Sequence, residues 1–135
     1  MYSSNTELTI AFYDIDATEV VWHGRYVKYL EIARCQLLES FAYDYVQMRD
    51  SGYLWPVVDM RIKYIKPLRL GQKISIEAVL VEWENRLKFK YLIRDKESGV
   101  RLSKAYTIQV AVDLSSGELC FESPPILLKK LGLTV

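Results

Sequence analysis

In the stretch Phe12-Tyr-Asp-Ile-Asp-Ala-Thr-Glu-Val-Val-Trp-His-Gly-Arg-Tyr26, the sequence changes from a strand pattern to a helix pattern. The strand pattern ends within this stretch, and the helix pattern begins at its last residue. Residues 7–13 are rich in strand-forming residues and partly alternate between polar and apolar, which predicts a half-buried strand. From Tyr26 onward, apolar residues recur at helical spacing and predict a helix of about four or five turns. They are Tyr26, Tyr29, Leu30, Ala33, Leu37 and Phe41. The chain therefore reverses between a strand and a helix within one short loop.

This loop carries Asp14, Asp16 and the single histidine of the chain, His23. The first amides of a helix have no partner within it, and the helix dipole places partial positive charge there. A carboxylate next to such a site suits attack on a carbonyl. Aspartates are also common in loops and helix caps for structural reasons alone, and a histidine at a helix start often caps or packs. The residues by themselves leave both interpretations open.

Several motifs spread over nearly the whole chain carry a family resemblance. They are Tyr13-Asp-Ile-Asp16, Val20-Val-Trp-His23 with Tyr26, Glu31-Ile-Ala-Arg34 and Tyr64-Ile-Lys-Pro-Leu-Arg-Leu-Gly71. Together they resemble the 4-hydroxybenzoyl-CoA thioesterase-like family of hotdog-fold acyl-CoA thioester hydrolases. The resemblance implies an α+β hotdog fold, in which an antiparallel sheet wraps around a long central helix. It also implies a single domain over residues 1–135.

The resemblance implies a role for individual residues of the first motif. Asp16 matches the catalytic carboxylate, the backbone N–H of His23 matches the group that polarises the thioester carbonyl, and Tyr26 matches a frequent tyrosine one turn further on. Glu19 departs from the family, which usually has glycine at that position. Its side chain could narrow the acyl pocket, add a second carboxylate or impose a different loop.

The implied reaction is hydrolysis of an acyl thioester. Asp16 would either activate a water as general base or attack directly to give a transient anhydride, and the sequence does not separate these routes. The carbonyl oxygen would face the amides of His23 and Gly24. No metal or redox cofactor is required, because coenzyme A or phosphopantetheine enters as part of the substrate. The acyl group would lie between the central helix and a partner subunit, against Trp22, Tyr26, Trp55, Val57 and Met60.

Basic residues at positions 86, 88 and 90 alternate with apolar ones and fall on one face of a predicted strand. They could bind the phosphates of the thiol carrier, or they could form a solvated outer sheet face. The resemblance favours phosphate binding by Arg86 and Lys88. The thiol carrier could be coenzyme A or an acyl carrier protein.

The rest of the chain predicts a short second helix over residues 41–50 and strands over residues 54–66, 73–82, 86–94 and 100–114. One helix followed by a run of antiparallel strands is an α+β pattern. Because a single sheet over one helix leaves edges to cover, we expect a homodimer or homotetramer. Two other functions remain as alternatives: a hotdog hydratase or dehydratase, and a non-catalytic protein that binds acyl thioesters. The sequence contains no Gly-x-Ser-x-Gly motif, which argues against a Ser-His-Asp hydrolase.

Composition excludes several further classes of protein. The chain has 18 basic and 17 acidic residues, a formal net charge of +1, which argues against a general nucleic-acid binder. Two isolated cysteines make no disulfide framework, and with one histidine they make no familiar zinc site. The N-terminus lacks the pattern of a signal peptide and no apolar run reaches membrane-spanning length, so we expect a cytoplasmic protein without a membrane segment.

Overall fold

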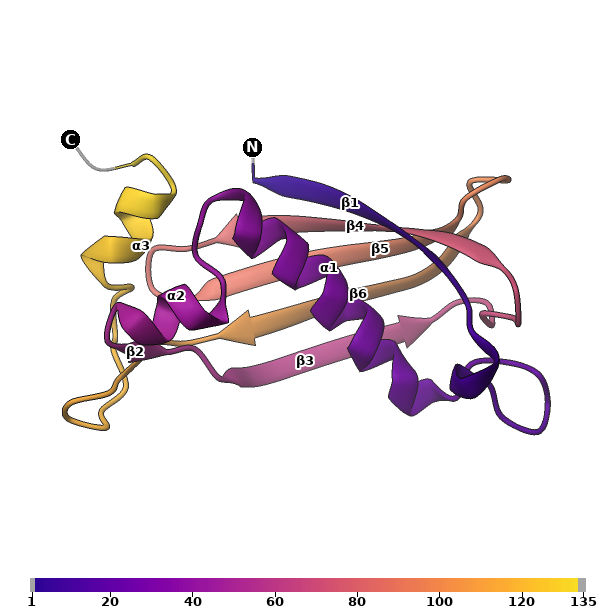
Figure 1. The fold of residues 1–135 in the computed structure, drawn as a ribbon, viewed down its shortest axis with the longest axis horizontal. Coiled ribbons are helices and arrows are strands. Elements are labelled where there is room, and N and C mark those ends of the chain that lie inside the picture. Colours follow the sequence, from indigo (N-terminus) through magenta and orange to yellow (C-terminus); the bar gives the residue numbers. More distant parts are fainter. Residues whose placement is uncertain (1, 134–135) are drawn as a thin grey trace.

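A computed structural model describes residues 2–133 and contains a five-stranded antiparallel sheet with one long helix across a single face (Figure 1). The strand order is β1-β4-β5-β6-β3, so the first strand lies at one edge and β3 at the other. The elements are β1 (Ser3–Thr9), α1 (Tyr26–Ser40), β3 (Val57–Tyr64), β4 (Lys73–Glu82), β5 (Leu87–Asp95) and β6 (Arg101–Gln109). This arrangement confirms the predicted α+β class and the hotdog fold.

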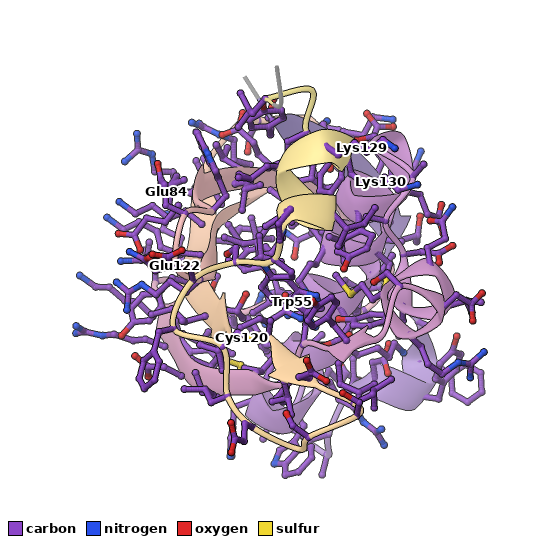
Figure 2. All side chains as sticks on the ribbon, turned by 90° about the vertical axis from the view of Figure 1, so that its left-hand side faces the viewer. Trp55, Glu84, Cys120, Glu122, Lys129 and Lys130 are labelled. Atoms are coloured by element: carbon purple, nitrogen blue, oxygen red, sulfur yellow. The ribbon has the colours of Figure 1, made fainter. Side chains whose placement is uncertain are left out.

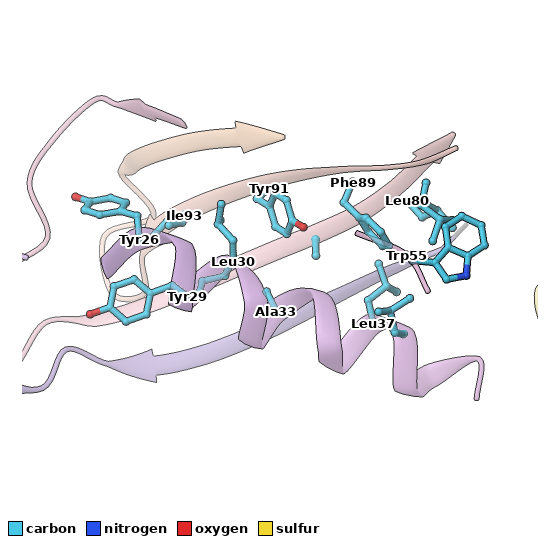
Figure 3. Packing of buried hydrophobic residues seen from close by; sticks show 14 of the residues in the cluster. Tyr26, Tyr29, Leu30, Ala33, Leu37, Trp55, Leu80, Phe89, Tyr91 and Ile93 are labelled. Atoms are coloured by element: carbon cyan, nitrogen blue, oxygen red, sulfur yellow. The ribbon is translucent and has the colours of Figure 1, made fainter. Parts of the chain in front are cut away.

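The core lies between α1 and the inner face of the sheet (Figure 3). The predicted apolar stripe of α1 is buried from Tyr26 to Leu37, while Phe41 caps the helix and is half-buried. Alternate residues of the two central strands oppose it, such as Ala78 of β4 and Phe89 of β5. The alternation of these strands therefore sets which sheet face receives the helix.

Short elements close one end of the molecule, at the left of Figure 1. They are α2 (Tyr45–Asp50), β2 (Tyr53–Leu54), β7 (Val112–Asp113) and α3 (Pro125–Lys130), of which β2 and β7 form a separate two-stranded sheet. A capping box begins α2, because the Asp44 side chain accepts from the amide of Gln47 while the Gln47 side chain accepts from the amide of Asp44.

The boundaries of three predicted elements were wrong. The first strand spans Ser3–Thr9 instead of residues 7–13, because the chain leaves β4 after Ile10 and forms a 3-10 turn over Phe12–Asp14. The second helix starts at Tyr45 instead of residue 41, since Ala42 has a φ of 58° and ends the helical path. The last strand is divided into β6 and β7, and α3 follows as an element that sequence patterns did not predict.

Strand β3 is an exposed edge with apolar side chains. Of its eight residues, seven are exposed and Ile62 is half-buried. The apolar members Val57, Val58 and Met60 are each at least 40% exposed. An unpaired edge of this kind offers free backbone groups and apolar surface to another chain.

Candidate active site

A tight hairpin holds Asp16 beside the start of α1. Ile15 and Val21 pair as an antiparallel bridge, and the Asp16 amide donates to the Val20 carbonyl at 2.9 Å. The Val21 amide donates to the carbonyl of Leu68 at 2.8 Å, which fastens the hairpin to the segment that follows β3. The loop is therefore fixed by backbone bonds on both sides of Asp16.

The Asp16 carboxylate is exposed and hydrogen-bonded only within its own loop in residues 2–133. Its Oδ1 accepts from the Thr18 hydroxyl at 2.5 Å and from the Thr18 amide at 2.8 Å. These two bonds lower the pKa of Asp16 below its ordinary value. The carboxylate is therefore ionised at neutral pH, with its Oδ2 available.

Asp14 has a different environment from Asp16, since its side chain is only 3% exposed. Both of its oxygens accept from Lys28 Nζ at 2.8 Å, and the hydroxyl of Tyr29 donates to Oδ2 at 3.0 Å. Burial by itself would raise the pKa of Asp14, but the bonds from Lys28 and Tyr29 outweigh it and the pKa is lowered. Asp14 thus joins the loop to α1, while Asp16 faces outward.

Two free amides point out of the start of the helix. Residues His23–Arg25 form a 3-10 turn that leads into α1, and no side chain caps either segment. Within residues 2–133, the amides of His23 and Gly24 donate no hydrogen bond. With the positive end of the helix dipole behind them, these amides can hold a developing oxyanion.

A cavity of about 330 Å³ brings Asp16 together with this helix start. Its walls include Asp16, His23, Tyr26, Tyr64 and Lys66, with Val20, Val21, Ile65 and Pro67 completing the lining. The ring of Tyr64 packs edge-on against that of Tyr26, with centroids 4.7 Å apart. Burial raises the pKa of Tyr26, so its hydroxyl remains protonated at neutral pH. The cavity thus combines one ionised carboxylate with apolar and aromatic walls.

Trp22 and Gly24 flank the cavity residue His23 in the sequence, and the two positions depend on each other. A Cβ on Gly24 would come within 2.3 Å of the Trp22 ring, so the indole lies over the space that the glycine leaves. The Trp22 ring is 5.1 Å from that of His23 and is half exposed. An added side chain at position 24 would push the indole outward.

Glu19 adopts backbone angles that favour glycine, with a φ of 65°. Left-handed backbone angles raise the conformational energy of a residue that has a Cβ. This accounts for the glycine that is usual at this position in the family described above. The Glu19 side chain is exposed and is not part of the cavity lining. The loop therefore keeps its shape at a cost in backbone energy.

Other residues proposed for the acyl pocket lie further from this cavity. Trp55 is buried at the opposite end of the core from Tyr26, where its Nε1 donates to the Tyr43 hydroxyl at 3.3 Å (Figures 2 and 3). Val57 and Met60 are exposed on edge strand β3 and do not line the cavity. The cavity that contains Asp16 is thus not lined by Trp55, Val57 or Met60 of the same chain.

The two proposed phosphate ligands lie at the start of β5, the end far from the loop that carries Asp16. Arg86 Nε pairs with Glu82 at 2.6 Å, and Lys88 Nζ lies 4.9 Å from the centre of the Tyr106 ring. Lys88 lies on the outer sheet face, opposite to α1, because its neighbours on both sides along β5 are buried in the core. The structure does not bring Arg86 or Lys88 into the cavity with Asp16.

The sequence interpretation missed Tyr64 and Lys66 as site residues. Both belong to the motif Tyr64-Ile-Lys-Pro-Leu-Arg-Leu-Gly71, which contributes to the family resemblance and mainly supports the fold. The available signal was the position of this motif at the end of a strand, where loops commonly carry functional residues. Among residues 2–133, no cluster of three or more His, Cys, Asp or Glu side chains could hold a metal ion. No helix in this part of the chain is long and apolar enough to cross a membrane.

Comparison with known proteins assigns this geometry to a family. A model described as the thioesterase-like superfamily matches residues 10–131. A Synechocystis protein named as a candidate esterase is 32% identical over 113 residues, which cover 83% of this chain and 68% of that protein. A Bacillus subtilis protein named as a candidate acyl-CoA thioesterase is 29% identical over 117 residues, covering 86% of this chain and 84% of that protein.

The fold is also close to that of solved structures. A 1,4-dihydroxy-2-naphthoyl-CoA thioesterase from Synechocystis superposes with a TM-score of 0.86 over 96% of both chains, at 19% identity. At that identity the likeness concerns the fold.

Proposed function

Because the chain belongs to the thioesterase-like superfamily, we propose that it hydrolyses acyl-CoA thioesters in the cavity between Asp16 and the start of α1. The observation that carries the proposal is a cavity lined by both an ionised carboxylate, Asp16, and His23, whose backbone amide and that of the next residue, Gly24, donate no hydrogen bond within residues 2–133. The name of the Bacillus subtilis relative supports acyl-CoA as the substrate class.

In this proposal the thioester carbonyl binds with its oxygen toward the amides of His23 and Gly24. Donors that are already fixed at a helix start stabilise the oxyanion without reorganisation. In one route Asp16 takes a proton from the attacking water, and the C–S bond then breaks as the thiol leaves with that proton. In the other route Asp16 attacks the carbonyl carbon and expels the thiolate, and water then hydrolyses the resulting anhydride to release the acid and restore the carboxylate. Rapid-quench mass spectrometry distinguishes the two routes, since only direct attack leaves the acyl group on the protein.

A second copy of the chain would complete the site. The apolar edge strand β3 is exposed along its length, and Tyr64 and Ile65 at its end line the cavity while remaining partly exposed. Pairing of two such edges would satisfy their backbone groups and cover Met60 and its neighbours. The acyl group would then lie between α1 and the partner subunit. A monomer mass in sedimentation at working concentration would contradict this part of the proposal.

A panel of acyl-CoA thioesters, assayed for release of free thiol, tests the function. We expect thiol release from at least one aromatic or aliphatic acyl-CoA. Hydration of an enoyl-CoA with the thioester intact would indicate a hydratase. Tight binding of acyl-CoA with no thiol release at any chain length would indicate a binding protein.

A further inference from the structure

The face of the sheet opposite to α1 carries a shallow groove of about 630 Å³ that the proposed reaction does not use. Its floor is apolar, with Val79, Val81, Leu92 and the ring of Tyr106 contributed by β4, β5 and β6. Five cations are interleaved with these apolar side chains: Arg61, Lys63, Lys90, Arg101 and Lys104, of which Lys90 lies directly between Val79 and Tyr106 in the sheet. Glu77 is the one carboxylate in the lining. We call this surface the basic outer face.

The five cations of the basic outer face lack anionic partners. Ion pairs within residues 2–133 engage other basic residues, such as Lys28 and Arg86, and none of the five. Lys63 and Lys104 even lie directly opposite each other in the β3–β6 ladder. Like charges in that position destabilise a sheet. Because the whole chain has a net charge of only +1, this concentration of positive charge is local.

The shape of the basic outer face favours a protein over a small ligand or a nucleic acid. A small-molecule pocket buries most of its ligand, but all five cations here are exposed. A shallow surface on which basic and apolar side chains alternate suits a protein partner that presents acidic side chains. Platforms for single-stranded nucleic acid use several exposed aromatic rings, and this floor presents the Tyr106 ring alone on its outward strand positions. Two copies of the chain that met through their basic outer faces would bring like charges together, so we do not assign this surface to self-association.

We propose that the basic outer face docks an acidic protein that delivers the acyl thioester to the Asp16 cavity. The nature of the delivered group, an acyl thioester, rests on the proposed function. The binding of an acidic protein does not. Strand β3 connects the two sites: Lys63 lines the groove, the next residue, Tyr64, lines the cavity, and Lys66 follows there. A thioester arm that passes the end of β3 would thus lead from the docked carrier to the catalytic carboxylate.

Titration calorimetry of the full chain with an apo acyl carrier protein, an acidic protein, tests the docking without any need for turnover. We expect binding that weakens as salt rises, because exposed charges are screened. The double variant K63E/K104E should bind at least about tenfold more weakly, since two charges that complement an acidic carrier become repulsive. The variant replaces the Lys63–Lys104 pair with a pair of glutamates at the same positions of β3 and β6. Because the two side chains still repel each other, the melting temperature should match that of the wild type.

The matched control is K129E/K130E, which changes the net charge by the same amount at the end of α3 (Figure 2). It should bind the carrier as the wild type does. Equal losses in both double variants would overturn the proposal, because general charge and not the basic outer face would then explain binding. No binding of the carrier would overturn it too, even if acyl-CoA is hydrolysed.

Two further probes separate this partner from other anions. In one outcome, the protein fails to bind the carrier but binds anionic phosphatidylglycerol vesicles or oligouridine, and that binding is lost in K63E/K104E. This result would assign the surface to a membrane or to RNA and overturn the proposal. Carrier binding by a protein that hydrolyses no thioester would sustain the docking and refute the proposed function. The two proposals can therefore fail separately.

Discussion

The hydroxyl of Tyr64, at the end of β3, donates a 3.2 Å hydrogen bond to the carbonyl of His23 in the turn that begins α1. This bond joins the edge strand to the backbone that presents the two free amides. The ring of Tyr64 also packs against Tyr26 inside the cavity. The orientation of the helix start thus depends on a residue 41 positions away in the sequence.

Tyr64→Phe should lower kcat/KM for the best acyl-CoA substrate about three- to tenfold, since one exposed hydrogen bond contributes about 1 kcal/mol. The ring packing is kept, so the melting temperature should fall by only a few degrees. Tyr13→Phe is the matched control, because it removes a hydroxyl from an exposed ring next to the same loop. Equal kinetics for Tyr64→Phe and wild type would show that the bond does not position the amides.

Asp16→Asn should reduce thioester hydrolysis at least about a hundredfold, because an amide can act neither as base nor as nucleophile. The side chain is exposed and bonded only to Thr18 among the described residues, so unfolding by denaturant should be nearly unchanged. Steady-state thiol release and a denaturant titration on one preparation measure both effects. A folded Asp16→Asn protein with normal turnover would remove Asp16 from the mechanism.

Thr18→Val should shift the acidic limb of the kcat/KM profile to higher pH. The Thr18 bonds lower the pKa of Asp16, and the hydroxyl supplies the first of them. Activity that needs the ionised carboxylate is lost as pH falls through this pKa, so a higher pKa moves the loss upward. Thr18→Ser keeps a hydroxyl at the position and is the control, with a profile that should match the wild type at the same salt concentration. An unshifted acidic limb in Thr18→Val would mean that another group sets it.

Asp14→Asn should destabilise the protein by about 2 kcal/mol, the usual cost of removing a charged hydrogen-bond partner. The folded-state pKa of Asp14 is lowered, so its contribution is present above the unfolded pKa of about 3.9 and is lost as pH falls through the folded value. The difference in unfolding free energy between wild type and variant should therefore shrink at acidic pH. Urea titrations at pH 7 and pH 3 would test this, and a constant difference would contradict it.

Glu19→Gly should stabilise the fold by about 0.5–1 kcal/mol, because glycine removes the left-handed strain and the greater entropy of the unfolded chain offsets only part of the gain. Since the Glu19 side chain lies outside the cavity lining, acyl preference should stay as in the wild type. The control Glu84→Gly, at an exposed loop residue without positive φ, should not stabilise. A shift toward bulkier acyl groups would show that Glu19 reaches the substrate.

Periodicity in the sequence predicted the central helix and most strands because burial on one side leaves a direct pattern. The same pattern could not locate Trp55 or Met60, since the topology of the sheet decides which residues meet at one site. Asp14 and Asp16 look alike in the sequence. The family resemblance selected Asp16, and the structure adds the physical difference: Lys28 and Tyr29 of α1 bond to the buried Asp14, while Asp16 is exposed.

The motif Glu31-Ile-Ala-Arg34 shows the same limit. Arg34 is buried at 1% exposure and bonds to Glu31, to the Tyr45 hydroxyl and to Thr107, so the motif fastens α1 to α2 and β6. In the sequence, this motif contributed only to the family resemblance. Helical spacing of three residues brings two charges together, but it does not indicate that tertiary contacts bury one of them.

The indole of Trp22 over Gly24 gives the protein an intrinsic optical probe of its own site. Of the three tryptophans, Trp55 lies in the core and Trp83 packs against Tyr2 at the far end of β4, so Trp22 is the one beside the cavity. An acyl group that displaces water from the start of α1 would change the polarity around this ring. Its fluorescence would then report occupancy directly, in the absence of turnover.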